Sequence, residues 1–304
     1  MEPRPETKVI QLDDGRDLAW IEVGDPAGAA VFAFHGSPGL GMDFSIYHDT
    51  ASHGGVRLIA VDRPGYGRST YQPRRRLSQW PADVSQLAEH LRIERFGVIG
   101  HSCGGPHALA CARFLPQRLL GCGVLSGLAP QAREPMTEGM LAAIRVQTAI
   151  YRHWPRALDP IAAGLWHVTR PPVRAALQYG RRDPQKGLDR MQKMLPPCDA
   201  AVVSRPELRP AMLAEVTGFT DAVLRTSIQD MAIGIRDWGF HLEDIEVSVH
   251  IWHGELDRNI PISHAHRQAD TIPGATLHAC PGEGHWLLVD HMSEILLNVT
   301  ADQP

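Results

Sequence analysis

A serine enclosed by glycines is the first feature of this sequence that could do chemistry. Ser102 stands in the stretch Gly100-His101-Ser102-Cys103-Gly104, between a short apolar run and an alanine-rich run. A serine on a tight strand-to-helix turn has a strained backbone that exposes its hydroxyl above a sheet, and the residues two positions away must be small. Gly100 and Gly104 meet that need. The pattern predicts that Ser102 is a nucleophile rather than a structural turn residue.

A serine hydroxyl needs a general base, and the base needs a carboxylate that orients it. Of the 16 histidines, His285 in "PGEGHW" is the expected base, because it follows the last predicted strand, where open α/β sheets build their sites. Asp257, in "GELD" after the preceding predicted strand, is the expected orienting carboxylate, and Glu255 is its rival. Glu283 and Asp290 lie too close to His285 in the sequence to be preferred.

An acyl-transfer reaction through a serine also needs N–H donors that stabilise the oxyanion of the tetrahedral intermediate. Cys103 directly follows Ser102 at the start of a predicted helix, so its backbone N–H is one expected donor. The second is the backbone N–H of Ser37 in "FHGSPG", with His35 and Gly36 beside it and Gly36 giving the backbone room to turn. The hydroxyl of Ser37 is a possible assistant, whereas the thiol of Cys103 is expected only to pack.

Neither a metal ion nor a cofactor is predicted. The five cysteines are scattered and form no CxxC pair, which indicates neither a zinc site nor a disulfide framework. His264 and His266 form an HxH pair, but no third ligand accompanies it in the sequence.

The elements that must position these residues alternate between strands and helices over the first 130 residues and again after residue 245. This rhythm predicts an α/β fold whose central sheet is mostly parallel and flanked by helices. The first two predicted strands flank a "DDG" turn and read as an antiparallel hairpin. Strands are predicted over 8–12, 17–23, 29–34, 56–61, 96–100, 119–126, 247–252 and 275–280, and helices near 42–52, from about Ser78, and near 263–269.

Between about residues 130 and 245 short apolar strands disappear, and helix-like segments broken by prolines replace them. The simplest interpretation is a helical cap, or lid, over residues 131–245, inserted into a core domain made of residues 1–130 and 246–304. Such a cap is expected to close over Ser102 and to define specificity.

Taken together, four motifs make the chain resemble the α/β-hydrolase superfamily from about Lys8 to Val299. They are "HGSPG", "DRPGYGRS" (62–69), "GHSCGG", and the pair "GELD" and "GHW". The chain order Ser102, Asp257, His285 is the order of that fold. The resemblance is to the lid-bearing branch of esterases, proline iminopeptidases and epoxide-hydrolase-like enzymes, and it implies a cap that follows the sixth strand.

Two departures from the relatives narrow the activity. Dehalogenases and epoxide hydrolases of this superfamily carry an aspartate at the apex of the turn, so Ser102 disfavours those reactions. Proline iminopeptidases carry "HGGPG" and a tryptophan after the serine, whereas this chain has Ser37 and Cys103 at those positions. These differences favour ester hydrolysis over aminopeptidase activity. The motif "DRPGYGRS" is shared widely and is interpreted structurally, with Asp62 and Arg63 holding the loop after their strand.

The sequence thus predicts a serine hydrolase of the carboxylesterase type, acting through an acyl-enzyme on an ester-like small molecule. The alternatives are an aminopeptidase or amidase, a C–C bond hydrolase with the same triad, and a ligand-binding receptor with little turnover. With 43% hydrophobic residues, 21% charged residues and a net charge of −4, the 304-residue chain gives no reason to expect a nucleic-acid or membrane partner. No signal peptide is visible, so a cytoplasmic protein is expected, and a homodimer is possible.

Overall fold

The computed structural model describes residues 5–131, 136–140, 145–146, 148–149, 153, 182–218 and 220–301. The expected cap, residues 131–245, is therefore described only in part, because most of its first half lies outside the described residues.

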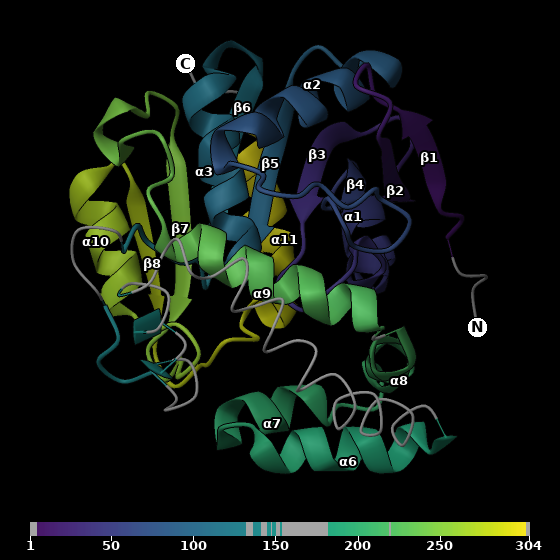
Figure 1. Ribbon diagram of the computed structural model, residues 1–304, viewed down its shortest axis with the longest axis vertical. Coiled ribbons are helices and arrows are strands. Elements are labelled where there is room, and N and C mark those ends of the chain that lie inside the picture. Colours follow the sequence, from purple (N-terminus) through teal and green to yellow (C-terminus); the bar gives the residue numbers. More distant parts are fainter. Residues whose placement is uncertain are drawn as a thin grey trace.

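One mixed β-sheet runs through the described part of the chain (Figure 1), in the order β1-β2-β4-β3-β5-β6-β7-β8. The first two strands are antiparallel to each other, and β2 is antiparallel to β4, while all other neighbours are parallel. The predicted hairpin and the mostly parallel sheet are confirmed. The strands are β1 (Lys8–Gln11), β2 (Asp17–Gly24), β3 (Ala29–Phe34), β4 (Val56–Asp62), β5 (Phe96–His101), β6 (Leu119–Leu125), β7 (Val249–Gly254) and β8 (Thr276–Cys280).

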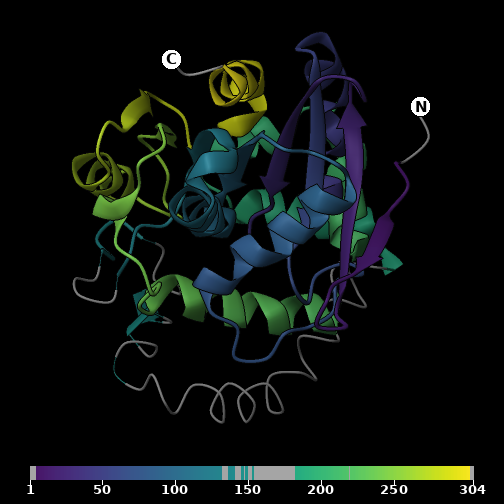
Figure 2. The ribbon, with the colours of Figure 1, turned by 90° about the horizontal axis from the view of Figure 1, so that it is seen from above.

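Helices cover both faces of this sheet, as Figure 2 shows from above. On one face lie α2 (Trp80–His90), α3 (Gly105–Phe114) and α10 (Ser263–Thr271), and on the other lie α1 (His48–His53) and α11 (Leu288–Thr300). This arrangement confirms the predicted fold class, a mostly parallel sheet between two helical layers.

Strand β3 shows why the sequences of the central strands are continuously apolar. Phe32 and Phe34 face the core beneath α2 and α3, while Val31 and Ala33 face the core beneath α11. Successive side chains of a strand point to opposite faces, so a strand covered by helices on both sides must be apolar throughout. All four side chains are fully buried.

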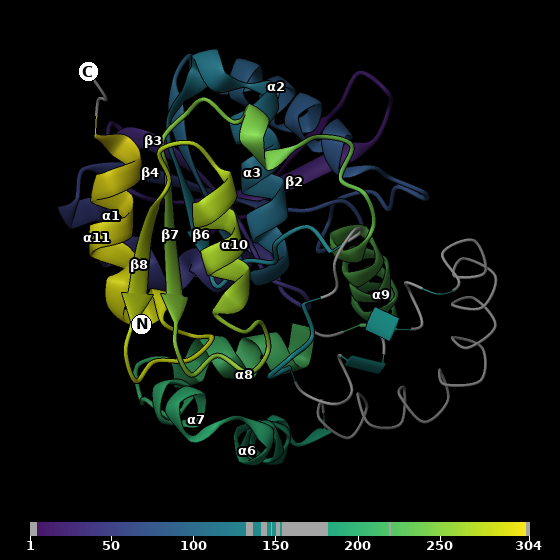
Figure 3. The same ribbon diagram turned by 90° about the vertical axis from the view of Figure 1, so that its left-hand side faces the viewer.

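The described residues between β6 and β7 include four α-helices, the first three of which stand at the end of the sheet toward which β7 and β8 point (Figure 3). They are α6 (Pro184–Met194), α7 (Pro197–Val203), α8 (Arg209–Gly218) and α9 (Asp221–Ile235). None of the helices in the described residues is both long enough and apolar enough to cross a membrane.

Two helix predictions differ from the structure at their N-terminal ends. The segment near 42–52 divides into a 3₁₀ helix, η1 (Gly41–Tyr47), and α1, because the carboxylate of Asp43 caps the backbone N–H of Leu40 and starts a tight turn. The helix expected from Ser78 begins with a 3₁₀ turn, η2 (Leu77–Gln79), whose Gln79 side chain caps the N–H of Arg76, before α2 starts at Trp80.

Candidate active site

Ser102 occupies the turn between β5 and α3, in a backbone conformation that few side chains adopt. Its φ angle is 54°, in the left-handed region, which costs a residue with a side chain on the order of 1–2 kcal/mol. A Cβ on Gly100 would lie 2.3 Å from the carbonyl oxygen of Gly104, and a Cβ on Gly104 would lie 2.1 Å from that of Phe34. Both positions therefore need glycine for the turn to close.

His285 and Asp257 meet in a buried hydrogen bond. His285 Nδ1 lies 2.7 Å from Asp257 Oδ2, and the two residues are 7% and 4% exposed. The other carboxylate oxygen, Asp257 Oδ1, accepts backbone N–H groups of Asn259 at 2.8 Å and Ile260 at 2.9 Å. The carboxylate is therefore fixed, and because it can only accept, Nδ1 of His285 carries the proton. Nε2 is left as the basic atom.

The pKa values of this pair shift in opposite directions. Burial alone would raise the pKa of Asp257, but the charge of the His285 imidazolium and its hydrogen bond outweigh burial and lower it. Burial alone would lower the pKa of His285, and the Asp257 carboxylate with its hydrogen bond reverses the sign and raises it. Each group thus stabilises the charged form of the other, so the imidazole is set to accept a proton.

His101 holds the backbone of His285 in place. Its Nε2 donates a hydrogen bond to the carbonyl oxygen of His285 at 3.1 Å, and the two rings lie 4.9 Å apart. Burial and the neighbouring His285 lower the pKa of His101 to about 3, so the ring is neutral at physiological pH. His101 is therefore a structural support for the loop that carries His285.

The loop after β3 is fixed by side chains and backbone from two directions. His35 Nδ1 donates to the carbonyl oxygen of Gly36 at 2.8 Å, and His35 Nε2 accepts the backbone N–H of Arg63 at 3.1 Å. The guanidinium of Arg63 donates to the same Gly36 oxygen at 2.8 Å. Arg63 thus holds not only its own loop, as the sequence indicated, but also the loop that contains Ser37.

A buried charged network joins this loop to α9 in the region of the expected cap. The Tyr66 hydroxyl lies 2.7 Å from Ser37 Oγ and donates to Asp230 Oδ2 at 2.8 Å. Asp230 also forms ion pairs with Arg63 and Arg75, and all three charged side chains are buried. The hydroxyl of Ser37 is therefore engaged by Tyr66.

The side chain of Cys103 points into a separate apolar cluster. Its thiol lies 3.6 Å from the sulfur of Met231 and packs among Leu128, Met140 and Ile260. Burial, together with the charge of Asp230, raises the pKa of the thiol to about 12, so it stays protonated. The backbone N–H of Cys103 lies in the first turn of η3 (Ser102–Gly104), where N–H groups have no partner within the helix.

A cavity of about 300 Å³ opens at Ser102. The loop after β3, η1, α6, α8 and the residues around His285 form its walls. Within the described residues no hydrogen bond joins the Ser102 hydroxyl to His285, although both line this cavity; such bonds often tighten only when substrate binds. The lining residues are His35, Gly36, Ser37, Pro38, Asp43, Phe44, Ile46, Tyr47, His101, Ser102, Met191, Leu195, Met212, Asn259, His285, Trp286 and Leu288.

Two acidic residues at this site were not predicted. Asp43 lines the cavity, and burial, with a contribution from Asp62, raises the pKa of its carboxyl to about 7. Asp199 of α7 is buried behind His285 and accepts the backbone N–H of Trp286 at 3.1 Å. Neither belongs to a short motif, and only the fold brings them to the site.

The HxH pair is not arranged as a chelate. His264 is buried, with Nδ1 accepting the backbone N–H of Ala129 and Nε2 donating to the carbonyl oxygen of Met136. His266 is exposed on the surface of α10.

Comparison with known proteins agrees with this architecture. A family model described as "Alpha/beta hydrolase family" matches residues 30–297. A proline iminopeptidase from Xanthomonas citri is 36% identical over 110 residues, which cover 34% of this chain and 34% of that protein. The chain thus matches about a third of the length of that relative.

Solved structures share the fold at low identity. An esterase from Exiguobacterium antarcticum superposes with a TM-score of 0.65 at 19% identity, covering 96% of this chain and 98% of that one. The enol-lactonase from Burkholderia xenovorans LB400 gives a TM-score of 0.65 at 15% identity, with 96% and 99% covered.

The left-handed backbone of Ser102 predicts an unusual order of stability among its variants. Ser102→Gly removes the side-chain penalty, whereas Ser102→Ala keeps it, so the glycine variant should be the more stable by about 1 kcal/mol. Urea unfolding measures the difference. As a control, Ala82→Gly in the helix α2 should destabilise by a similar amount. An alanine variant as stable as the glycine variant would contradict the strained turn.

The raised pKa of Asp43 predicts a pH-dependent cost to stability. Between its ordinary value of 3.8 and the folded value of about 7, the folded chain holds a proton that the unfolded chain has lost, so the free energy of unfolding falls as pH rises. Asp43→Asn mimics the neutral acid and still accepts the N–H of Leu40. Its stabilisation over the wild type should be small near pH about 4 and grow toward pH about 8 in urea titrations. An equal stabilisation by Asp43→Asn near pH about 4 and near pH about 8 would refute the raised pKa of Asp43.

Proposed function

This chain belongs to the alpha/beta hydrolase family, and we propose that it is a serine hydrolase that cleaves an ester-like acyl substrate. The observation that carries the proposal is the 2.7 Å hydrogen bond between Asp257 and His285 at the cavity that Ser102 also lines. A nucleophile, a base with a fixed tautomer and an orienting carboxylate are the parts that this chemistry needs.

In the proposed reaction Ser102 Oγ attacks the carbonyl carbon of the substrate, and its proton passes to Nε2 of His285. Asp257 stabilises the resulting imidazolium, in line with the raised pKa of His285. The tetrahedral intermediate collapses when the C–O bond to the alcohol breaks and His285 protonates the departing oxygen. A water molecule, deprotonated by His285, then attacks the acyl-enzyme and forms a second tetrahedral intermediate. The bond between its carbon and Ser102 Oγ breaks as His285 returns the proton to that oxygen, which releases the acid and restores Ser102.

The oxyanion of both intermediates is assigned to the backbone N–H groups of Cys103 and Ser37. Two features support the assignment: the Cys103 N–H lies at a helix start, and the hydrogen bonds of His35 and Arg63 to Gly36 fix the loop of Ser37. Donors held in advance stabilise developing charge without reorganisation.

The helices between β6 and β7 are proposed to form the cap of this enzyme. Met191 and Leu195 at the end of α6 and Met212 of α8 line the cavity, which supports a role in substrate selection. All five cysteines are free, which is in line with a proposed cytoplasmic location, where thiols stay reduced.

A second candidate activity, release of an N-terminal residue from a peptide, is favoured by one observation. The relative from Xanthomonas citri is named a proline iminopeptidase. The same three residues would serve an amide, with the leaving amine protonated by His285.

Active-site labelling tests the nucleophile. A fluorophosphonate should modify the wild type at Ser102 and leave Ser102→Ala unmodified, and hydrolysis of p-nitrophenyl esters should fall at least about 10³-fold in that variant. Ser126→Ala is a matched control. Like Ser102, Ser126 is buried, directly follows a strand and has a positive φ angle. Labelling that persists in Ser102→Ala, or is lost in Ser126→Ala, would overturn the assignment.

The two candidate substrates are separated by comparing p-nitrophenyl esters of graded chain length with prolyl and alanyl p-nitroanilides. A serine hydrolase of the ester type should turn over the esters with much higher kcat/KM. Efficient cleavage of the prolyl anilide alone would favour the aminopeptidase instead.

The orienting carboxylate can be distinguished from its rival by two amide variants. Asp257→Asn should lower kcat on the order of 10³–10⁴-fold, because an amide can present its N–H to Nδ1 and favour the wrong tautomer of His285. Glu255→Gln, at an exposed side chain two residues away, should keep kcat near that of the wild type. The reverse result in steady-state kinetics would assign the role to Glu255.

A further inference from the structure

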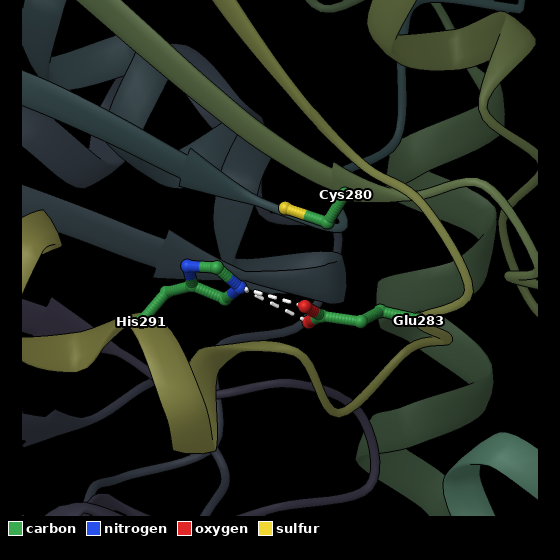
Figure 4. Close-up of side chains that lie close together, drawn as sticks. All are labelled: Cys280, Glu283 and His291. Carbon is green, nitrogen blue, oxygen red and sulfur yellow. Dashed lines mark hydrogen bonds and ion pairs between the residues drawn. The ribbon is translucent and has the colours of Figure 1, made fainter.

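We propose that Cys280, Glu283 and His291 form a binding site for a divalent transition-metal ion of the Zn²⁺ type. The three side chains come from the end of β8, the turn after it and α11. In Figure 4 the His291 ring and the Glu283 carboxylate point toward each other, and the Cys280 side chain lies beside them. His291 Nε2 lies 2.9 and 3.1 Å from the two oxygens of Glu283. One ligand atom from each residue lies within 4.8 Å of the other two.

The ligand types select the metal. A thiolate, an imidazole and a carboxylate suit Zn²⁺, whereas Ca²⁺ and Mg²⁺ prefer oxygen ligands alone. Zn–ligand distances of about 2.0–2.3 Å place tetrahedral ligand atoms about 3.3–3.6 Å apart. The Glu283–His291 pair, now 2.9 and 3.1 Å apart, must therefore open slightly, and small side-chain rotations can bring the three ligand atoms to these distances. Glu283 and His291 are partly exposed, so a water molecule can take the fourth position.

Charged and backbone groups around the cluster contact its three residues. Glu294 Oε2 lies 3.7 Å from Nδ1 of His291, on the side of the ring away from Glu283. A carboxylate that faces the second nitrogen of a metal-binding histidine is the usual outer support of such sites. The backbone carbonyls of Cys280 and Glu283 accept N–H groups of the loop after β7, at 3.1 and 2.8 Å, which fixes both ligands' main chains.

An ordinary ion pair between His291 and Glu283 is the competing explanation of this cluster. With side chains 24% and 33% exposed, such a pair contributes little to stability, because water screens the attraction between the two charges. It has no need for the thiol of Cys280, which is buried beside it. Dependence on Cys280 therefore separates a metal site from an ion pair.

A bound ion would cross-link the residues on either side of His285. Cys280 and Glu283 precede His285 in the chain and His291 follows it, on three different parts of the fold. Binding should therefore protect this segment from unfolding, whether or not the chain hydrolyses esters.

The test uses the full chain, stripped with EDTA and kept reduced. Titration with Co²⁺ should give a thiolate-to-cobalt charge-transfer band that saturates at one equivalent, and Zn²⁺ should displace it and raise the Tm. Cys280→Ser should lose the band, and Glu283→Gln, which keeps the shape of the side chain, should weaken Zn²⁺ binding at least about 10-fold in calorimetry.

Two variants control for adventitious binding. Cys198→Ser removes a thiol that is partly exposed and so more accessible to metal than the buried Cys280, and His53→Ala removes an exposed histidine. Both variants should bind Zn²⁺ like the wild type. A charge-transfer band that survives in Cys280→Ser, or that disappears in Cys198→Ser, would overturn the site. So would Zn²⁺ affinity that is unchanged in a folded Glu283→Gln. These readouts need no substrate, so they stand apart from the proposed hydrolysis.

Discussion

The close approach of two backbones beneath Ser102 is the constraint on which the site depends. The backbone of Gly104 packs so tightly against the end of β3 that a methyl group would overlap the carbonyl of Phe34. This contact places the start of α3 beside the loop that follows β3, so Ser102 and Ser37 come to one edge of the sheet. The parallel strands β7 and β8 end at the same edge, which brings Asp257 and His285 to it. The strand order, more than any single residue, brings the residues of the site together.

A second constraint is electrostatic and ties the helices after β6 to the core. Asp230 of α9 is fully buried between the guanidinium groups of Arg63 and Arg75, and both arginines lower the pKa of its carboxyl against the effect of burial. Loss of one partner from such a group leaves a buried charge uncompensated, at a cost of about 3–5 kcal/mol. Because Arg63 also binds the Gly36 carbonyl and Tyr66 also contacts Ser37, docking of α9 and the shape of the loop after β3 are parts of one network.

A structural feature could be predicted from the sequence where the residues of one segment determine it by themselves. Strand β3 occupies the predicted residues 29–34, because a strand buried on both faces must be apolar throughout. The pairing of His285 with Asp257 could be predicted because each follows a strand at the edge where sites form, and the two are hydrogen-bonded in the structure. A contact between distant segments could not be predicted where no expected chemistry called for a partner: Tyr66 reaches Asp230 across 164 positions. His291 and Glu283 are eight positions apart, but their approach depends on how α11 packs against the sheet. The predicted strand 247–252 lies two residues too early, because pairing with Cys280 extends β7 to Gly254.

The composition of the cavity wall restricts what can lie beside Ser102. Met191, Leu195 and Met212 supply one side, and neither lysine nor arginine is among the lining residues that the structure describes. An anionic acyl group would therefore lose its hydration without gaining a cationic partner, a cost that an apolar wall cannot offset. Asp43 adds to this effect, since its carboxylate form repels a second negative charge. Its pKa, raised to about 7 by burial, makes the repulsion strongest above neutral pH. In the proposed reaction a neutral acyl group, or one that donates a hydrogen bond to Asp43, would meet no such cost, so this wall would favour uncharged and hydrogen-bond-donating acyl groups over carboxylates.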